Sequence, residues 1–300
     1  MRLSRLIHRL VRHQRWEIGL VRQPIHSFLE HEFVPDVAWM PARDRRQFRA
    51  DPFLLPLGNR QIVLYEDYDY RTHLGRISAG VADGGQIREL KTDVLPLRCH
   101  LAYPFTLQYD GRWLCIPESH QDFEVSVWEM DDGTLTMRKV GTILKGVPAV
   151  DSTVFQYDGR WWLACTRQDN RPLEQLHIFH ADDLFGKWQP HPKNPVKSDS
   201  SCTRPAGTPF LHDGQLYRPA QNCSQRYGAA VAINRIVTLT PDVFEEETVR
   251  FVKPIQDGPF PMGIHTISCV GDMTVVDGLR YEFFPSEMLR LAGSKLVPSR

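Results

Sequence analysis

The chain has 300 residues, and its 36 lysines and arginines balance its 36 aspartates and glutamates. A chain with no net charge exerts no overall attraction on a polyanion, so we expect no nucleic-acid partner. The length allows one large domain or two average ones.

The first 34 residues are predicted to form an amphipathic N-terminal extension, followed by one domain over residues 35–300. The apolar residues of one helical stripe are Leu3, Leu6, Ile7, Leu10 and Val11, and arginines lie around the rest of it. The pattern predicts a short helix that packs on the domain. Weak contact with an anionic membrane surface is the alternative.

An internal repeat is the strongest signal in the sequence. The strand and turn around Asp110-Gly111 recur almost literally around Asp158-Gly159, 48 residues later. Each copy predicts a hairpin, because Asp-Gly suits a turn with positive φ between two apolar strands. Weaker copies place further turns at residues 58, 213 and 277. Five repeats of this length predict an all-β fold, a five-bladed β-propeller.

The segments between the hairpins support this interpretation. Residues 125–129 and 176–180 alternate as half-buried strands do, and no long helical period follows residue 35. Residues 35–40 precede the first repeat, and we expect them to pair with the last blade and close the ring, which removes exposed sheet edges.

Polar residues recur where the inner strand of each blade begins and where the antiparallel second strand ends. These places meet at one end of the propeller axis. The candidates there are Asp51, Glu66, Tyr103, Glu118, Asp151, Arg204, Arg218, Gln221 and His265. Carboxylates mixed with arginines suit sugar hydroxyls, and cleavage of a glycosidic bond needs one acid and one base or nucleophile. The simpler interpretation is that the aspartates only cap turns.

Cofactor and metal motifs are not found. The six cysteines form no CxxC pair and no zinc-like cluster, so we expect buried free thiols. No secretion signal precedes them, and a cytoplasmic location is expected. Dinucleotide, P-loop and GxSxG motifs do not occur, so no cofactor is predicted. His265 could bind substrate, or could hold a water or a metal on the axis.

Three short motifs, at residues 50–52, 151–160 and 181–188, resemble the five-bladed glycosidases of arabinanase, xylosidase and invertase type. More closely, residues 45–285 are similar to the N-terminal propeller domain of plant glucosamine inositolphosphorylceramide transferases and their bacterial relatives. The resemblance implies that Asp51 is the base or nucleophile and that Asp151 orients and tunes it.

The glycosidase pattern is broken at the expected acid, where this chain has Arg204 instead of a glutamate. Glu118 is a substitute acid by position only, and Arg204 could instead bind an anionic group of a sugar. Two hypotheses follow. The chain is either an enzyme that acts on a glycosidic bond of a glycan or glycoconjugate, or a sugar-binding propeller that serves a glycosyltransferase or a polysaccharide assembly system.

Overall fold

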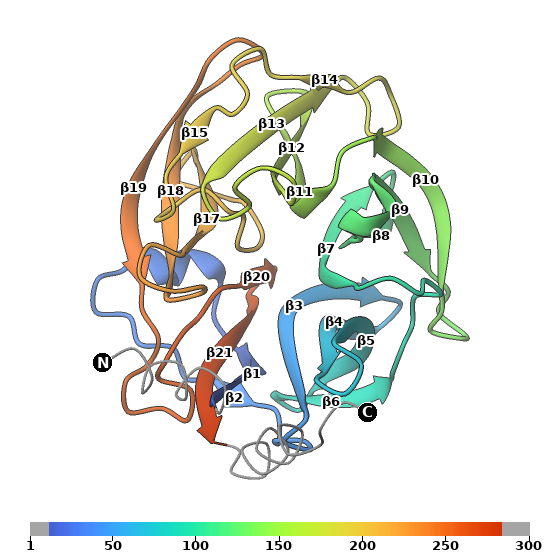
Figure 1. Ribbon diagram of the computed structural model, residues 1–300, viewed down its shortest axis with the longest axis vertical. Helices are drawn as coiled ribbons and strands as arrows, with labels where there is room; N and C mark the ends of the chain where they lie inside the picture. The colour runs from blue at the N-terminus through green and yellow to red at the C-terminus, as the bar shows by residue number, and fades with distance from the viewer. Residues whose placement is uncertain (1–11, 284–300) are drawn as a thin grey trace, which may run out of the picture.

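The computed structural model describes residues 12–283, which form five β-sheets around a common axis (Figure 1). The predicted five-bladed β-propeller is therefore confirmed. The helical elements of this part are two short 3₁₀ segments, η1 (Ile25–Leu29) and η2 (His120–Asp122). Within the same residues, no helix has the length and apolar character needed to cross a membrane.

Four blades take their strands in chain order from the axis outward. Blade one contains β3 (Gln47–Leu57), β4 (Arg60–Asp69), β5 (Leu74–Asp83) and β6 (Gln86–Lys91). Blade two contains β7 (Ala102–Tyr109), β8 (Arg112–Glu118), β9 (Glu124–Met130) and β10 (Met137–Lys145). Blade three contains β11 (Ala149–Tyr157), β12 (Arg160–Arg167), β13 (Gln175–Ala181) and β14 (Gln189–Pro190), with β15 (Lys197–Ser198) also paired to β13. Blade four contains β16 (Phe210–His212), β17 (Gln215–Asn222), β18 (Ala230–Leu239) and β19 (Phe244–Val252).

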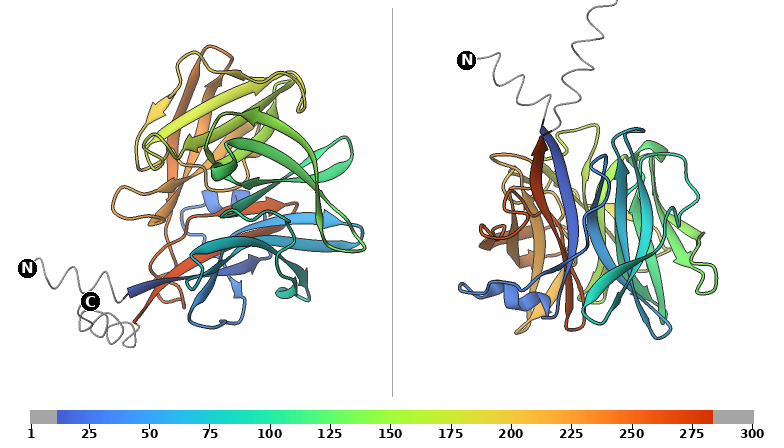
Figure 2. Two further views of the ribbon diagram at one scale, coloured as in Figure 1. Left: turned by 45° about the vertical axis from the view of Figure 1, so that its right-hand side comes forward. Right: turned by 90° about the horizontal axis from the view of Figure 1, so that it is seen from below.

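The fifth blade is built from both ends of the described chain. Its inner strands are β20 (Ile267–Val270) and β21 (Met273–Phe283), and its outer strands are β1 (Arg12–Val21) and β2 (Ala38–Trp39). β1 pairs antiparallel with the whole length of β21 from its residue 274 onward, and the two strands run side by side in Figure 2. The ring closure expected of residues 35–40 is confirmed for β2, which joins the blade through β1.

The predicted separate extension over residues 1–34 is wrong for the part that the structure describes. Residues 12–21 form strand β1 of the propeller. They pair with the outer edge of β21, which no other described strand covers. Trp16 and Ile18 of this strand are buried. The helical stripe from Leu3 to Val11 lies outside the described residues, and with it the expected membrane contact.

All five hairpins between the first two strands of a blade have two-residue loops. The strand ends pair as Leu57 with Arg60, Tyr109 with Arg112, Tyr157 with Arg160, His212 with Gln215 and Val270 with Met273. In three of them an Asp-Gly pair takes positive φ at both positions, as the repeat predicts. The fifth predicted turn, at residue 277, is wrong: the turn is at Gly271-Asp272, and Asp277 lies inside β21.

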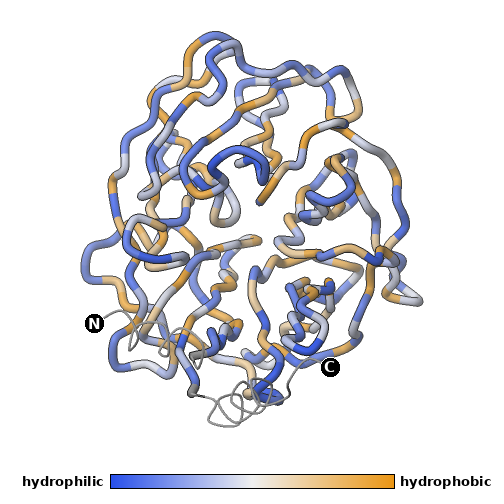
Figure 3. The backbone as a smooth tube through the Cα atoms, in the orientation of Figure 1, coloured by the Kyte–Doolittle hydropathy of each residue, from blue (hydrophilic) through white to orange (hydrophobic). Residues whose placement is uncertain are grey.

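The core lies between neighbouring blades. Phe53, Phe105 and Trp161, from blades one, two and three, share one cluster of buried apolar residues. Hydrophobic stretches run along the strands in Figure 3, while hydrophilic residues predominate in the outer loops. This packing holds the inner strands at fixed places around the axis, where the candidate residues lie.

Candidate active site

The inner strands of three blades share the same backbone irregularity in their first half. In β3, β7 and β11 the pairing with the second strand shifts register, at Asp51, Tyr103 and Asp151 respectively. These residues have φ of 51°, 41° and 52°, in the left-handed region that non-glycine residues avoid. Strained bulges of this kind cluster at functional sites because they re-aim a side chain.

Register brings two glutamates to the same end of the axis. Glu66 of β4 pairs with Ala50, the residue before Asp51, and Glu118 of β8 pairs with Ala102, the residue before Tyr103. Both glutamates are buried, as are Asp51 and Asp151. The structure therefore brings together the four carboxyl groups that the sequence analysis singled out.

Asp51 is held by residues of blade five. Its Oδ1 accepts a hydrogen bond from the Thr266 hydroxyl at 2.7 Å and lies 3.1 Å from His265 Nε2. Its Oδ2 accepts the Tyr103 backbone N–H at 3.3 Å. The other ring nitrogen of His265, Nδ1, lies 2.8 Å from Asp277 Oδ2, although within residues 12–283 no acceptor meets the hydrogen-bond geometry for its N–H.

These contacts set the charges of the pair. Burial disfavours the His265 cation, but the charges of Asp277 and Asp51 outweigh it and raise the pKa of His265 well above its usual value. Burial also opposes ionisation of Asp51, but His265 and the Thr266 hydroxyl outweigh it and lower the pKa of Asp51. Asp51 is therefore a carboxylate beside an imidazolium.

Asp151 is paired with Arg204 from blade four. Arg204 Nε donates to Asp151 Oδ2 at 2.6 Å, and a terminal nitrogen reaches Oδ1 at 3.3 Å. Gln221 Nε2 donates to the same Oδ2 at 2.9 Å. Burial opposes the Arg204 charge, but Asp151, Tyr227 and Glu118 outweigh it and raise the pKa of Arg204. The guanidinium lies over the ring of Tyr227, 5.4 Å from its centroid.

The two glutamates have different surroundings. Glu118 Oε1 lies 2.9 Å from His120 Nδ1, and its Oε2 accepts the Asp151 backbone N–H at 3.3 Å. Burial raises the pKa of Glu118, but the His120 hydrogen bond and the Arg204 charge outweigh it and lower that pKa. This argues against Glu118 as the proton donor. Burial raises the pKa of Glu66 well above its usual value, and the charges of Asp51 and Glu118 raise it further.

Two predicted substrate-binding residues lie elsewhere or are fully engaged. Arg218 is buried inside blade four, where it pairs with Glu246 at 2.6 Å, so its placement at the axis end is wrong. Its side chain instead reaches across the blade from β17 to Glu246 of β19. The Tyr103 hydroxyl accepts the Gly207 N–H at 2.7 Å and lies 2.8 Å from the Thr153 hydroxyl. Tyr103 thus joins three blades and has no exposed surface.

Several residues of the site were missed by the sequence analysis. They are Trp16, His100, His120, Tyr227, Thr266 and Asp277. His120 could have been found, because it follows Glu118 by two positions at the same strand end. Asp277 was assigned to a turn, and Trp16 to the N-terminal extension. Trp16 packs against the His265 ring with centroids 4.1 Å apart.

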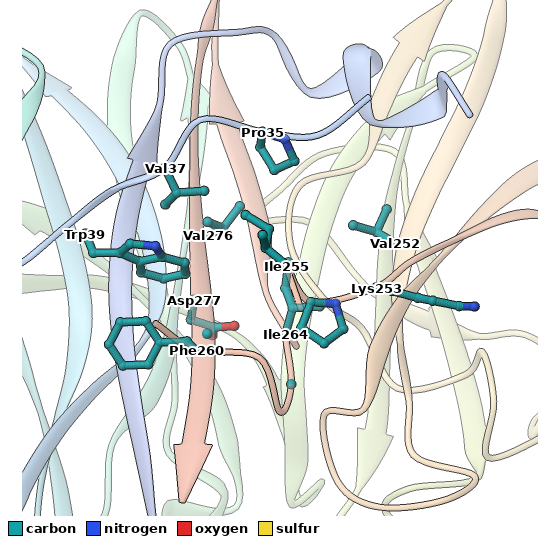
Figure 4. A pocket seen from close by; sticks show the side chains of 13 residues that line it. Pro35, Val37, Trp39, Val252, Lys253, Ile255, Phe260, Ile264, Val276 and Asp277 are labelled. Carbon is teal, nitrogen blue, oxygen red and sulfur yellow. The ribbon is translucent and has the colours of Figure 1, made fainter. Parts of the chain in front are cut away.

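One group in the described part of the chain could hold a metal ion. Asp51, His265 and Asp277 each offer a ligand atom, and these atoms lie within 4.8 Å of one another. A metal would have to displace the proton of the His265 ring, so the imidazolium and a metal are alternatives. Asp277 also lines the pocket in Figure 4, which lies between Trp39, Phe260 and Val252. At about 20 Å³ that pocket accepts a water but no sugar ring.

The arrangement of blades is that of the glycoside hydrolase propellers. A family 117 glycoside hydrolase from the marine bacterium Zobellia galactanivorans superposes with a TM-score of 0.55 at 14% identity, covering 95% of this chain and 98% of that one. A family 43 β-1,3-galactosidase superposes with a TM-score of 0.53 at 10% identity, covering 72% of this chain and 83% of that one. Likeness at such identity establishes the fold alone.

Sequence comparison gives the family. The chain belongs to the family described as glucosamine inositolphosphorylceramide transferase 1, N-terminal, whose model matches residues 39–257. Glucosamine inositolphosphorylceramide transferase 1 of Oryza sativa subsp. japonica is 34% identical over 213 residues, and that of Arabidopsis thaliana 31% over 210 residues. Each match covers 68% of this chain but only 28% and 27% of the respective relative.

Proposed function

We propose that this propeller is a carbohydrate-active enzyme that acts on a glycosidic bond of a glycan or glycoconjugate, with Asp51 as base or nucleophile. The observation that carries the proposal is the setting of Asp51: a buried carboxyl group at a strained bulge, whose Oδ1 lies 3.1 Å from His265 Nε2 and 2.7 Å from the Thr266 hydroxyl, contacts that outweigh its burial and lower its pKa. A preformed anion of this kind is what attack on an anomeric carbon, or on a water beside it, requires.

Asp151 has a supporting role in the proposal. Both of its oxygens are occupied by Arg204, so it is a poor nucleophile. Burial raises the pKa of Asp151 well above its usual value even against the Arg204 charge, so we assign it the role of holding that guanidinium beside the other acids. The named activity of the relatives supports a sugar-containing glycoconjugate as substrate. The cytoplasmic location stays a prediction from the sequence.

The test is turnover of a panel of 4-nitrophenyl glycosides, glucosaminides included, and of polysaccharides. We expect Asp51→Asn to reduce turnover at least about 10²-fold. Asp213→Asn is the matched control, because Asp213 also has positive φ but lies in an exposed turn. Equal turnover by wild type and Asp51→Asn would refute the role of Asp51. Thermal unfolding of each variant checks its fold.

A second function is favoured by one observation. Arg204 stands where a glycosidase acid is expected and is tied to Asp151, which suits recognition of a sugar without cleavage. The propeller would then serve a glycosyltransferase, as the names of its longer relatives suggest. This candidate predicts that a glycan array or calorimetry detects binding, that no substrate of the panel is turned over, and that Arg204→Met weakens the binding.

A further inference from the structure

Glu66 differs from Glu118 in what its carboxyl group contacts. Both Glu118 oxygens are engaged, one by His120 and one by the backbone of blade three. The Glu66 carboxyl makes no hydrogen bond with any other side chain or backbone group among residues 12–283, and its closest ionic neighbour is His100, 3.7 Å away. Its side chain is 8% exposed, close to the 6% of Asp51, so both side chains are buried to a similar degree.

His100 is fixed in one protonation state by the backbone. The Gly75 N–H donates to His100 Nδ1 at 2.9 Å, so Nδ1 carries no proton. The neutral ring then has its proton on Nε2, the atom nearest Glu66 Oε1. Burial lowers the pKa of His100, which agrees with a neutral ring. The histidine beside Glu66 is therefore neutral. Burial and the charges of Asp51, Glu118 and Asp151 raise the pKa of Glu66, and the His265 cation opposes them only in part.

Gly75 also makes the room that the carboxyl group occupies. A Cβ at this position would lie 2.3 Å from Glu66 Oε1 and 2.4 Å from the Leu101 carbonyl oxygen. The glycine thus makes room for the carboxyl group of Glu66 against β5, between the backbone of Gly75 and the Leu101 carbonyl oxygen. This is a defined seat for a carboxyl group rather than a freely moving side chain.

We propose that Glu66 is the proton donor of the reaction in which Asp51 is base or nucleophile, seated for that task by Gly75 and His100. The inference rests on the proposed function. The proton passes from the Glu66 carboxyl to the glycosidic oxygen as the bond from that oxygen to the anomeric carbon breaks. The bond electrons stay with the oxygen, which leaves as an alcohol. The new bond at the anomeric carbon comes from Asp51 or from a water that Asp51 deprotonates.

The protonated state of Glu66 can be tested without any substrate. The ionisable groups that face it are Asp51 on β3, Glu118 on β8, Asp151 on β11, His100 before β7, His265 before β20, and Tyr68 and Tyr70 at the end of its own strand. A glutamate with a raised folded-state pKa stabilises the fold when protonated, and this contribution is lost as pH rises through that pKa. Urea unfolding is measured from pH 5 to 8 for wild type, Glu66→Gln and Glu118→Gln.

The two variants should differ in how their unfolding constants, compared with that of wild type, depend on pH. Relative to Glu66→Gln, the unfolding constant of wild type should rise about tenfold per pH unit from pH 5 until the folded-state pKa is reached. Relative to Glu118→Gln it should not change with pH in this window, because Glu118 is ionised in both the folded and the unfolded state above pH 5. If the ratio of the unfolding constants of wild type and Glu66→Gln did not change with pH, the proposal would be overturned.

The catalytic role is tested with leaving groups of different acidity. An alkyl glycoside needs a proton donor, whereas a 2,4-dinitrophenyl glycoside of the same sugar does not. Glu66→Gln should lower kcat/KM about 10²-fold or more on the alkyl substrate, lower it less than tenfold on the aryl one, and abolish the alkaline fall of the pH profile. Equal losses on both substrates would overturn Glu66 as the donor and leave the proposed function standing. Absence of turnover by wild type on every substrate would overturn both.

Discussion

Arg218 offers a test of whether blade four depends on a buried ion pair. Its guanidinium donates two hydrogen bonds to Glu246, at 2.9 and 2.6 Å, and one each to the carbonyl oxygens of Thr203 and Cys202. Both charged side chains are 1% exposed. Lys197, the other cation on Glu246, is 21% exposed. We expect Arg218→Met to leave a buried carboxylate with one weaker partner.

The size of the effect follows from these contacts. Breaking a buried pair by removing one partner costs about 3–5 kcal/mol of unfolding free energy, because the other charge stays buried. The carbonyl oxygens of Thr203 and Cys202 would also lose their hydrogen bonds to Arg218, which lowers the unfolding free energy further. Replacing both partners, as in Arg218→Met with Glu246→Met, should recover part of the loss, since no unpaired carboxylate remains.

Urea unfolding of the two single variants and the double variant measures the coupling directly. Arg235→Met is the matched control, because Arg235 of β18 pairs with Glu247 of β19 in the same blade but on the exposed face, where such a pair contributes about 1 kcal/mol or less. The reasoning is refuted if Arg218→Met costs no more than the control, or if the double variant loses the full sum of the two single losses.

Three further outcomes are expected. Gly207→Ala should destabilise by about 2 kcal/mol or more, since its Cβ would lie 1.7 Å from the Ile267 carbonyl oxygen, whereas Gly159→Ala, in an open turn, should cost about 1 kcal/mol; thermal unfolding compares them. Tyr103→Phe should cost about 1–3 kcal/mol in the same assay, because the buried Gly207 N–H loses its acceptor; no loss would refute that contact. Burial and the Asp122 charge raise the pKa of Cys99 to about 11. Alkylation of Cys99 in the folded protein should therefore be slow at pH 8 and should accelerate about tenfold per pH unit up to the pKa, as measured by mass spectrometry of the labelled peptide. Fast labelling at pH 8 would contradict the raised pKa.

The sequence predicts the blades well because each hairpin is local. The Asp-Gly turns at 110, 158 and 213 determine their own strands, and antiparallel pairing then carries Glu66 and Glu118 to the end where the inner strands begin. The fifth blade was harder to predict. Its outer strand comes from residues 12–21, whose pairing with β21 spans most of the chain and leaves no local signal.

The sequence predicts which residues belong to the site better than it predicts what each of them contacts. Strand position singled out Asp51 and Asp151, but which partner each carboxyl group meets depends on contacts between blades. Asp277 illustrates the limit, because an Asp-Gly pair reads as a turn even where it lies inside a strand. The contrast between Glu66 and Glu118 depends on His100 and His120, whose ring orientations are set by a distant backbone N–H and by a neighbouring carboxylate.

The closure of blade five has a consequence for how the molecule is made. Arg12 and Phe283 are paired residues, so the sheet forms only after nearly all of the chain between them has been synthesised. Blades one to four can fold during synthesis, whereas β1 stays unpaired until β21 has been synthesised. A circular permutant that joins the two ends by a short linker and opens the exposed turn at Asp158-Gly159 would make blade five from one continuous segment. Such a chain should acquire that blade earlier in folding, and with it the partners of Asp51.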